Sequence, residues 1–240
     1  MPGLKIRLFY KEKFMLCGII GAMPKEVEAI KDKMLNIKEE NIQGVDFYFG
    51  KINNQDVILT KSGVGKVNAS IITTLMIMTY HPDYIVNIGT AGGMLKEQNT
   101  LDIVISENVI QHDFDTSYID GKSGIGITTK SDELLRNKVK ESFLKNKVDS
   151  NIYFGDIISG DVFVGEEVKV LELKEKFPTA IACEMEAAAI GYTCDKFNIP
   201  FIIIRSLSDI VHHDNSNIDF MKNVEITSKR SADMLEEFLK

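Results

Sequence analysis

Residues 180–190 read AIACEMEAAAI, an apolar run interrupted by two acidic side chains, Glu184 and Glu186. The first half favours a strand and the alanine-rich second half a helix. We therefore predict a strand followed by a helix, with both glutamates in the first helical turn, where free N–H groups tolerate negative charge. Two interpretations remain open: the glutamates complement the helix dipole, or they contact a substrate. Burial of a carboxylate is costly unless it is paired or hydrogen-bonded.

On both sides of this segment, strand-like and helix-like patterns alternate, which is typical of a sheet flanked by helices. We expect strands at 16–20, 45–51, 56–61, 84–88, 101–109, 151–159 and 201–205, and helices from Pro24 onward and at 66–80, 132–146 and 219–239. The polar, glycine-containing stretch 111–126 predicts a long loop. No internal repeat or linker-like break occurs, so we expect one domain at 15–240 after an N-terminal extension at 1–14.

The composition excludes some classes of protein. Of 240 residues, 44% are hydrophobic and 26% charged, and the net charge is −7. An acidic chain is unsuited to non-specific binding of nucleic acid or of an anionic membrane surface. The apolar run 69–79 is too short to span a bilayer, and no signal peptide is evident. Cys17, Cys183 and Cys194 lack disulfide-framework and zinc spacings, so we expect reduced core thiols in a cytoplasmic protein.

Several motifs are only partial. Residues 18–23 lack the G-x-G-x-x-G spacing of a dinucleotide site, and residues 60–67 resemble a P-loop but have Thr60 and Val67 at two defining positions. Both are better interpreted as tight strand-to-helix turns. The segments 111–115 and 212–214 contain His and Asp but lack the two-histidine spacing of a zinc hydrolase. We therefore predict neither a catalytic metal nor an organic cofactor.

Chemically useful groups follow the ends of predicted strands. The glycines in 89–93 would let backbone amides approach a ligand closely. Residues 205–209, RSLSD, end a buried strand with a cation, hydroxyls and a carboxylate, which makes Asp209 a candidate general acid. The alternative is that Asp209 caps the next turn. Glu26, at a helix start, is expected to face the same crevice or to complement the helix dipole.

Six segments, at 21–26, 61–67, 87–93, 159–163, 184–187 and 205–209, occur in an order that resembles the 5′-methylthioadenosine/S-adenosylhomocysteine nucleosidases of the nucleoside phosphorylase superfamily. The resemblance extends from Met15 to the C-terminus. It implies a single-domain α/β fold with three α/β/α layers and a central mixed twisted sheet. It also implies a small-molecule nucleoside as the substrate.

The resemblance also implies roles for individual residues. Glu26 matches the base that activates water, and Asp209 matches the proton donor to the purine. Glu186 matches the acid that binds the ribose hydroxyls, with Met185 packed beside the sugar. Phe163 matches the aromatic side chain that stacks on adenine.

Further positions match the rest of the binding site. Val164 would present backbone groups to the edge of the base, and Gly92 would line the site. Thr90 stands where a serine is common, which keeps the hydroxyl and adds a methyl group. Arg205 and Ser208 match residues that orient the catalytic acids.

The 5′ group of the substrate should meet an apolar pocket formed by Met23, Val64 and Phe220. The match of Phe220 is affected by the loop after Asp209, which is one residue longer than the family pattern. The family resemblance implies a homodimer in which residues 111–126 close the partner's 5′ pocket.

The implied reaction is hydrolysis of the N-ribosidic bond of methylthioadenosine and adenosylhomocysteine, and also of 5′-deoxyadenosine, in methionine salvage and methyl-cycle recycling. Two alternatives share the scaffold. A purine nucleoside phosphorylase would need arginines or an amide nest for phosphate, which Glu26 would repel. A non-catalytic purine-binding protein would be expected to lack one of Glu26, Glu186 and Asp209, and all three are present.

Overall fold

The computed structural model describes residues 15–145, 150–210 and 216–240. The expected N-terminal extension at 1–14 lies outside the described residues, and so does the segment that contains His212, His213 and Asp214.

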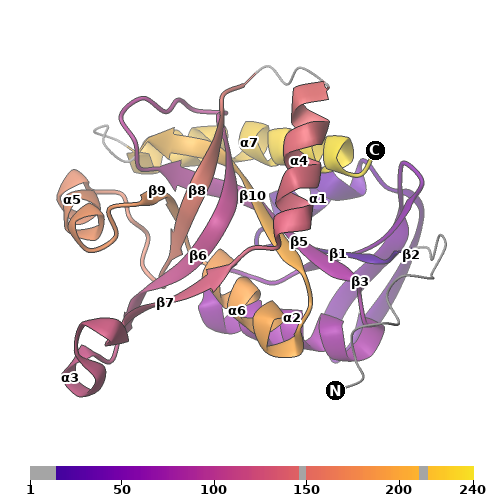
Figure 1. The fold of residues 1–240 in the computed structure, drawn as a ribbon. Helices are drawn as coiled ribbons and strands as arrows, with labels where there is room; N and C mark the ends of the chain where they lie inside the picture. Colours follow the sequence, from indigo (N-terminus) through magenta and orange to yellow (C-terminus); the bar gives the residue numbers. More distant parts are fainter. Residues whose placement is uncertain (1–14, 146–149, 211–215) are drawn as a thin grey trace.

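The described strands form one mixed sheet (Figure 1). In chain order they are β1 (Cys17–Gly21), β2 (Leu35–Ile42), β3 (Val45–Ile52), β4 (Gln55–Lys61), β5 (Tyr84–Gly93), β6 (Ile103–Asp115), β7 (Ile125–Lys130), β8 (Ile152–Ser159), β9 (Ala180–Glu184) and β10 (Phe201–Ile210). Their order in the sheet is β10-β6-β8-β9-β5-β1-β4-β3-β2, and β7 pairs with β6. A further pairing between β10 and β5 closes β10, β6, β8, β9 and β5 into a ring.

Helices cover both faces of the sheet. They are α1 (Pro24–Lys31), α2 (Lys66–Tyr80), α3 (Ser117–Asp120), the short 3-10 helix η1 (Gly121–Gly124), α4 (Glu133–Lys145), α5 (Glu167–Lys176), α6 (Ala187–Phe197) and α7 (Ser216–Phe238). One apolar cluster joins α1, α4 and α7 to the sheet, and a second joins α2 and α6 to its other face. The expected three-layer α/β/α fold with a central mixed sheet is therefore confirmed.

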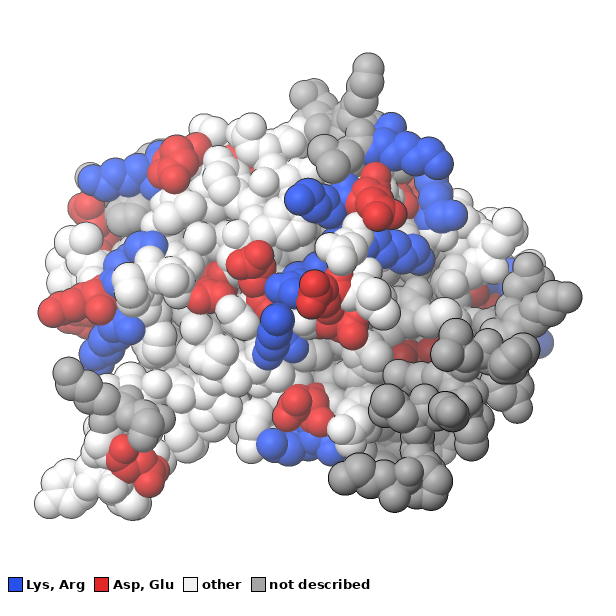
Figure 2. All heavy atoms as spheres, in the orientation of Figure 1, with Lys and Arg blue, Asp and Glu red and all other residues white. Residues whose placement is uncertain are grey.

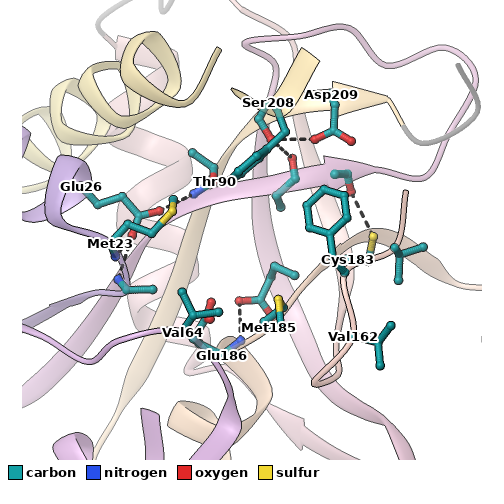
Figure 3. A pocket seen from close by; sticks show the side chains of 17 residues that line it. Met23, Glu26, Val64, Thr90, Val162, Cys183, Met185, Glu186, Ser208 and Asp209 are labelled. Carbon is teal, nitrogen blue, oxygen red and sulfur yellow. Dashed lines mark hydrogen bonds between the residues drawn. The ribbon is translucent and has the colours of Figure 1, made fainter. Parts of the chain in front are cut away.

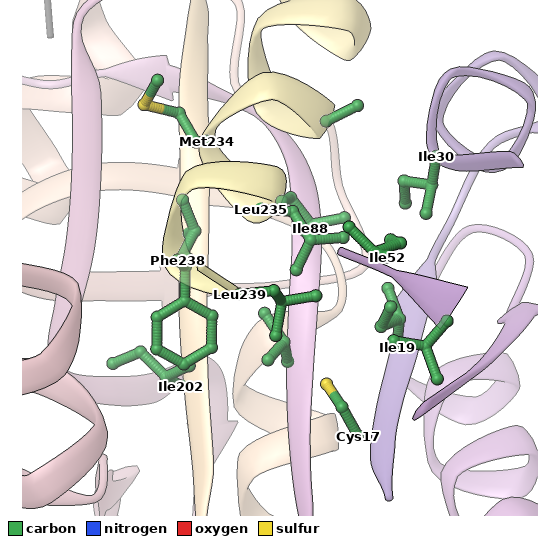
Figure 4. Packing of buried hydrophobic residues seen from close by; sticks show 14 of the residues in the cluster. Cys17, Ile19, Ile30, Ile52, Ile88, Ile202, Met234, Leu235, Phe238 and Leu239 are labelled. Carbon is green, nitrogen blue, oxygen red and sulfur yellow. The ribbon is translucent and has the colours of Figure 1, made fainter. Parts of the chain in front are cut away.

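Alternation along the strands explains why both faces are covered. Successive side chains of a strand point to opposite faces, and Ile202 belongs to the cluster under α7 whereas Ile203 belongs to the cluster with α6. Figure 4 shows Phe238 and Leu239, at the end of the chain, gathered with Ile202 and Ile88. A strand that is apolar at every position, such as the start of β10, is thus buried on both sides.

The surface of the protein carries both acidic and basic side chains. On the face drawn in Figure 2, acidic and basic side chains lie interspersed rather than in a continuous basic area. No helix among the described residues is long and apolar enough to cross a membrane. Cys17, Cys183 and Cys194 are free and buried, as the sequence indicated.

The predicted loop at 111–126 was wrong. Strand β6 continues to Asp115, and after α3 and η1 the chain returns as β7, which pairs antiparallel with β6. Figure 1 shows α3 at the tip of this ribbon, beyond the body of the sheet. Because the ribbon extends from the sheet, half of its strand positions are solvated, and their polarity made a paired strand resemble a loop.

The expected positions of the two glutamates also need correction. Glu184 is the last residue of β9, paired with Ser159 of β8, and Glu186 is the N-cap of α6, so neither lies in the first helical turn. The glycines in 89–93 do not form a turn after β5, because they continue the strand and pair with β10 and β9. Strand β2 and helix α5 were not predicted from the sequence.

Candidate active site

A cavity of about 250 Å³ opens where β5, β9 and β10 end beside the turns before α1 and α2. It contains every residue proposed from the sequence for binding or catalysis except Arg205 (Figure 3). Its lining comprises Ala22, Met23, Glu26, Val64, Thr90, Ala91, Gly92, Val162, Phe163, Val164, Cys183, Glu184, Met185, Glu186, Ser208, Asp209 and Phe220.

Glu26 is held rigidly at one side of the pocket. Its Oε2 accepts hydrogen bonds from the amides of Ala22, at 2.7 Å, and Met23, at 2.9 Å, and its Oε1 accepts one from Thr90, at 3.1 Å. Burial raises the pKa of the Glu26 carboxyl, while the charge of Arg205 and the three amides act in the opposite direction. The side chain is therefore a buried carboxyl in which burial outweighs the hydrogen bonds and the charge that favour its ionised form.

The strand beside Glu26 must carry a glycine. A Cβ atom on Gly89 would lie 2.6 Å from Oε1 of Glu26, which is closer than van der Waals contact permits. Gly89 lies on β5, where it pairs with Arg205 of β10. The absence of a side chain here is what allows the carboxylate to reach the amide of Thr90.

Asp209 lies across the pocket from Glu26 (Figure 3). It is 2% exposed, and its Oδ1 accepts a hydrogen bond of 2.7 Å from the hydroxyl of Ser208. A bulge between Leu207 and Asp209 interrupts the pairing of β10 with β5. Asn223 of α7 donates to the carbonyl of Ser208 at 2.8 Å, which fixes this irregular strand end.

Glu186 lies at a third side of the pocket, and its Oε1 accepts a hydrogen bond of 2.9 Å from the amide of Gly65. Burial, with a further contribution from the negative charge of Glu184, raises the pKa of Glu186 to about 8. Glu184 is engaged differently: its Oε2 pairs with Nη2 of Arg205 at 2.7 Å and accepts the amide of Ala187 at 2.9 Å. The two neighbouring glutamates thus occupy different electrostatic environments.

Arg205 does not line the pocket. It is 2% exposed, and its Nη2 donates to both Glu184 and Asn87. From this position Arg205 contacts Glu184, an acid of the pocket wall, and does not face the cavity itself.

Apolar side chains complete the pocket. The rings of Phe163 and Phe220 meet edge to face with their centroids 5.5 Å apart. Sequence reasoning missed four lining residues: Ala22, Ala91, Val162 and Cys183. All four are direct neighbours in the chain of residues that were identified, so proximity to the motifs was the available signal.

The partial P-loop at 60–67 has a structural explanation. The amides at the start of α2, which a phosphate loop would offer to a ligand, are occupied by carboxylates: Gly65 donates to Glu186, and Lys66 donates to Oδ1 of Asp161 at 2.8 Å. Asp113, in the histidine-containing segment 111–115, forms an ion pair with the side chain of Lys66. Among the described residues, no cluster of three or more His, Cys, Asp or Glu side chains could hold a metal ion.

Comparison with known proteins gives a consistent relationship. The family model of the phosphorylase superfamily matches residues 17–240. The 5′-methylthioadenosine/S-adenosylhomocysteine nucleosidase of Staphylococcus haemolyticus is 39% identical, over 94% of this chain and 99% of its own length.

Solved structures agree with this relationship. The nucleosidase of the same name from Neisseria meningitidis, in complex with methylthio-immucillin-A, has a TM-score of 0.88 and 32% identity, over 94% of this chain and 98% of that chain. The futalosine hydrolase of Helicobacter pylori has a TM-score of 0.87 and 29% identity, over 94% of this chain and 97% of that chain. The chain therefore belongs to the 5′-methylthioadenosine/S-adenosylhomocysteine nucleosidases, N-glycosyl hydrolases of the phosphorylase superfamily.

Proposed function

We propose that the chain hydrolyses the N-ribosidic bond of 5′-methylthioadenosine and S-adenosylhomocysteine, and also of 5′-deoxyadenosine, releasing adenine and the 5-substituted ribose. The observation that carries this proposal is the presence of three separate buried carboxyls, Glu26, Glu186 and Asp209, around one largely apolar pocket. Cleavage of such a bond develops positive charge on the sugar while the leaving purine gains electrons. Acids on different sides of the substrate can stabilise the positive charge on the sugar and donate a proton to the leaving purine.

The three acids then have different tasks. Asp209 donates a proton to the purine as it leaves, and Glu26 removes a proton from the water that attacks the anomeric carbon. Glu186 accepts hydrogen bonds from the ribose hydroxyls, and in its ionised form its charge favours the positive charge that develops on the sugar. Ser208 supports Asp209 through the hydrogen bond to its carboxyl. The amides of Ala22, Met23 and Thr90 support Glu26 in the same way, by donating hydrogen bonds to its carboxylate.

The remaining lining residues suit the two ends of the substrate. Phe163 would stack on adenine and the backbone of Val164 would contact its edge, while Met185 would pack beside the sugar. Thr90 and Gly92 would line the ribose side of the site. The apolar side chains of Met23, Val64 and Phe220, which line the same cavity, would receive the methylthio group.

Hydrolysis is favoured over phosphorolysis by the charge of the pocket. No lysine or arginine is among its described lining residues. Lys25, the cation that precedes Glu26 in the chain, pairs with Glu28 at 3.6 Å on the surface. The amides of Ala22, Met23 and Thr90 already bind the Glu26 carboxylate, and this carboxylate would repel phosphate.

The test is adenine release from methylthioadenosine with and without phosphate. We expect the same rate in both conditions, with free methylthioribose as the second product. Formation of a ribose 1-phosphate, or a rate that depends on phosphate, would establish the phosphorylase instead. Binding of adenine without turnover of any of the three nucleosides would establish the non-catalytic alternative.

We further propose that the chain acts as a homodimer in which residues 111–126 close the partner's 5′ pocket. Tyr118 and Ile119, on α3, are 103% and 84% exposed in the single chain, which is unusual for two adjacent apolar side chains. The ribbon that carries them projects from the body of the molecule (Figure 1). A second copy of the chain is the partner that the family relationship favours.

The cellular role proposed for this activity is recycling of the two nucleosides in methionine salvage, methionine biosynthesis and the methyl cycle. The place proposed for it is the cytoplasm. Its support is chemical: Cys17, Cys183 and Cys194 are all unpaired and buried, as thiols are in a reducing compartment.

A further inference from the structure

A buried polar chain lies behind the pocket wall and begins at Asn87, near the middle of β5. Asn87 is 1% exposed. Its Nδ2 donates to the carbonyl of Ile20 on β1 at 2.8 Å, and its Oδ1 accepts a hydrogen bond from Nη2 of Arg205 on β10. The same Nη2 is paired with Oε2 of Glu184 on β9 at 2.7 Å. Asn87 and Glu184 therefore hold one guanidinium group between three neighbouring strands.

The amide of Asn87 has a single orientation in this arrangement. Only its NH₂ group can donate to the carbonyl of Ile20, so its oxygen must face Arg205. A polar side chain at the centre of a two-sided sheet is costly unless its hydrogen bonds are made. A purely structural role for Asn87 would be to hydrogen-bond the buried guanidinium group of Arg205. That role does not explain why the charge of Arg205 is held near two acids of the pocket.

Arg205 influences two acids of the pocket besides its direct partner. Burial is the largest cause of the raised pKa of Glu26, and Arg205 is the largest of the causes that lower it. For Glu186, burial and the charge of Glu184 raise the pKa, Glu26 adds to this, and the amide of the α2 N-terminus and Arg205 lower it. The charged groups that face the pair are thus Glu184 on β9, Arg205 on β10 and the two acids themselves.

We propose that Asn87 is a positioning residue for the reaction: it holds the Arg205 guanidinium beside Glu184, where its positive charge acts on both Glu26 and Glu186. Because Asn87 is neutral, it holds the Arg205 guanidinium in place without neutralising its positive charge. An acidic residue at the same position would accept the same hydrogen bond from Arg205, but its negative charge would offset the effect of Arg205 on Glu26 and Glu186. The proposal rests on the proposed function for its kinetic test but not for its spectroscopic test.

The direction of the effect follows from the sign of the charge. Arg205 favours the ionised forms of Glu26 and Glu186, so the loss of its fixed position raises the pKa of both carboxyls. The reaction needs Glu26 ionised as a base, and the acidic limb of kcat/KM should therefore move to higher pH. We expect a shift of about one pH unit. At pH values below the acidic limbs of both the wild type and the variant, this corresponds to about a tenfold lower kcat/KM for the variant.

The experiment compares the wild type with Asn87→Leu, which removes the hydrogen bonds, and Asn87→Asp, which keeps the shape and adds a negative charge. The control is Ser106→Ala, because Ser106 is also fully buried and hydrogen-bonded, to Ser131 and to the amide of Ile203, without touching Arg205. Adenine release is measured across pH, and the glutamate carboxyls are titrated by ¹³C NMR in the substrate-free protein. Asn87→Asp serves alone if Asn87→Leu does not fold.

We expect both Asn87 variants to move the acidic limb of kcat/KM to higher pH and to raise the carboxyl titration midpoints of Glu26 and Glu186. Ser106→Ala should change neither the limb nor the midpoints. A uniform loss of kcat/KM with an unmoved limb and unmoved carboxyl midpoints would reduce Asn87 to a structural residue and overturn the proposal. If the wild type releases no adenine, the proposed function fails by itself, and the carboxyl titration alone still decides the role of Asn87.

Discussion

At the scale of single residues, Glu26, Glu186 and Asp209 are all buried, yet their partners differ. Glu26 accepts three backbone amides, Glu186 accepts one amide beside a second glutamate, and Asp209 accepts a serine hydroxyl. Amides that donate to a carboxylate stabilise its ionised form, which suits a base. The sequence shows three acids at strand ends, but only their surroundings distinguish the tasks.

The roles of the two catalytic acids can be separated by the leaving group. Asp209→Asn keeps the shape of the side chain and removes the proton, so adenine release should fall by about 10²–10⁴-fold. A riboside with a nitrophenolate leaving group needs no proton and should recover much of that loss. Glu26→Gln should show no such recovery, because the attacking water still lacks its base. Equal impairment of Asp209→Asn on both substrates would show that Asp209 is not the acid.

The raised pKa of Glu186, about 8, predicts how stability depends on pH. Below its unfolded pKa the carboxyl is protonated in both states. As the pH rises from that value toward the folded pKa, only the unfolded state ionises, so the stability lost by burying this group grows and is complete above the folded value. Glu186→Gln removes this penalty. Its Tm should therefore match that of the wild type near pH 5 and exceed it above about pH 8. A Tm difference that is constant between these values would contradict the raised pKa; Glu225→Gln, an exposed site, is the control.

At the scale of elements, the start of α2 organises two parts of the site. The amide of Gly65 holds Glu186, and the next amide, of Lys66, holds Asp161 in the segment that carries Phe163 and Val164. The predicted span of this helix, 66–80, is confirmed. Its glycine-rich approach gives the N-terminal amides freedom to meet the carboxylate at the N-cap of α6 and the one in the loop after β8.

Asp161→Ala should release the loop that carries the stacking residue. The side chain of Asp161 is about half exposed, so the expected loss of stability is modest, on the order of 1 kcal/mol, as for a lost helix cap. We expect a severalfold increase in KM for methylthioadenosine with little change in kcat, because Phe163 and Val164 contact the base and not the reacting bond. Steady-state kinetics test this. Asp195→Ala, another exposed acid paired with a lysine, should change neither constant; a fall in kcat alone for Asp161→Ala would refute the idea.

At the scale of the whole molecule, ring closure brings the site together. Strand β5 pairs with β1, β9 and β10, so Thr90, Glu184 and Asp209 meet although they come from distant parts of the chain. The same topology leaves the β6–β7 ribbon projecting with its apolar tip uncovered. A single chain therefore holds the acids in place but leaves the ribbon tip without an apolar partner.

The dimer is tested at the ribbon tip. Sedimentation of the wild type at micromolar concentration should give twice the 27.0 kDa chain mass. Tyr118→Asp should shift the protein toward monomer and reduce activity in parallel, because a charge is buried in the interface. Leu134→Asp, at a site 78% exposed on α4, is the matched control and should remain dimeric. A fully active wild-type monomer would rule out the proposed lid.

The sequence by itself determined the alternation of elements, the span of α2 and the acids of the pocket, because local periodicity and short motifs encode them. It did not predict β2, whose charged residues lie on an exposed sheet edge and form a strand only through pairing with β3. It also placed Glu184 in the first helical turn, where the structure has the end of β9. Only the tertiary structure decided that Arg205 lies between Asn87 and Glu184, since these partners meet through pairing of strands far apart in the chain. Local patterns carry no record of such pairing, because its free energy comes from contacts between distant segments.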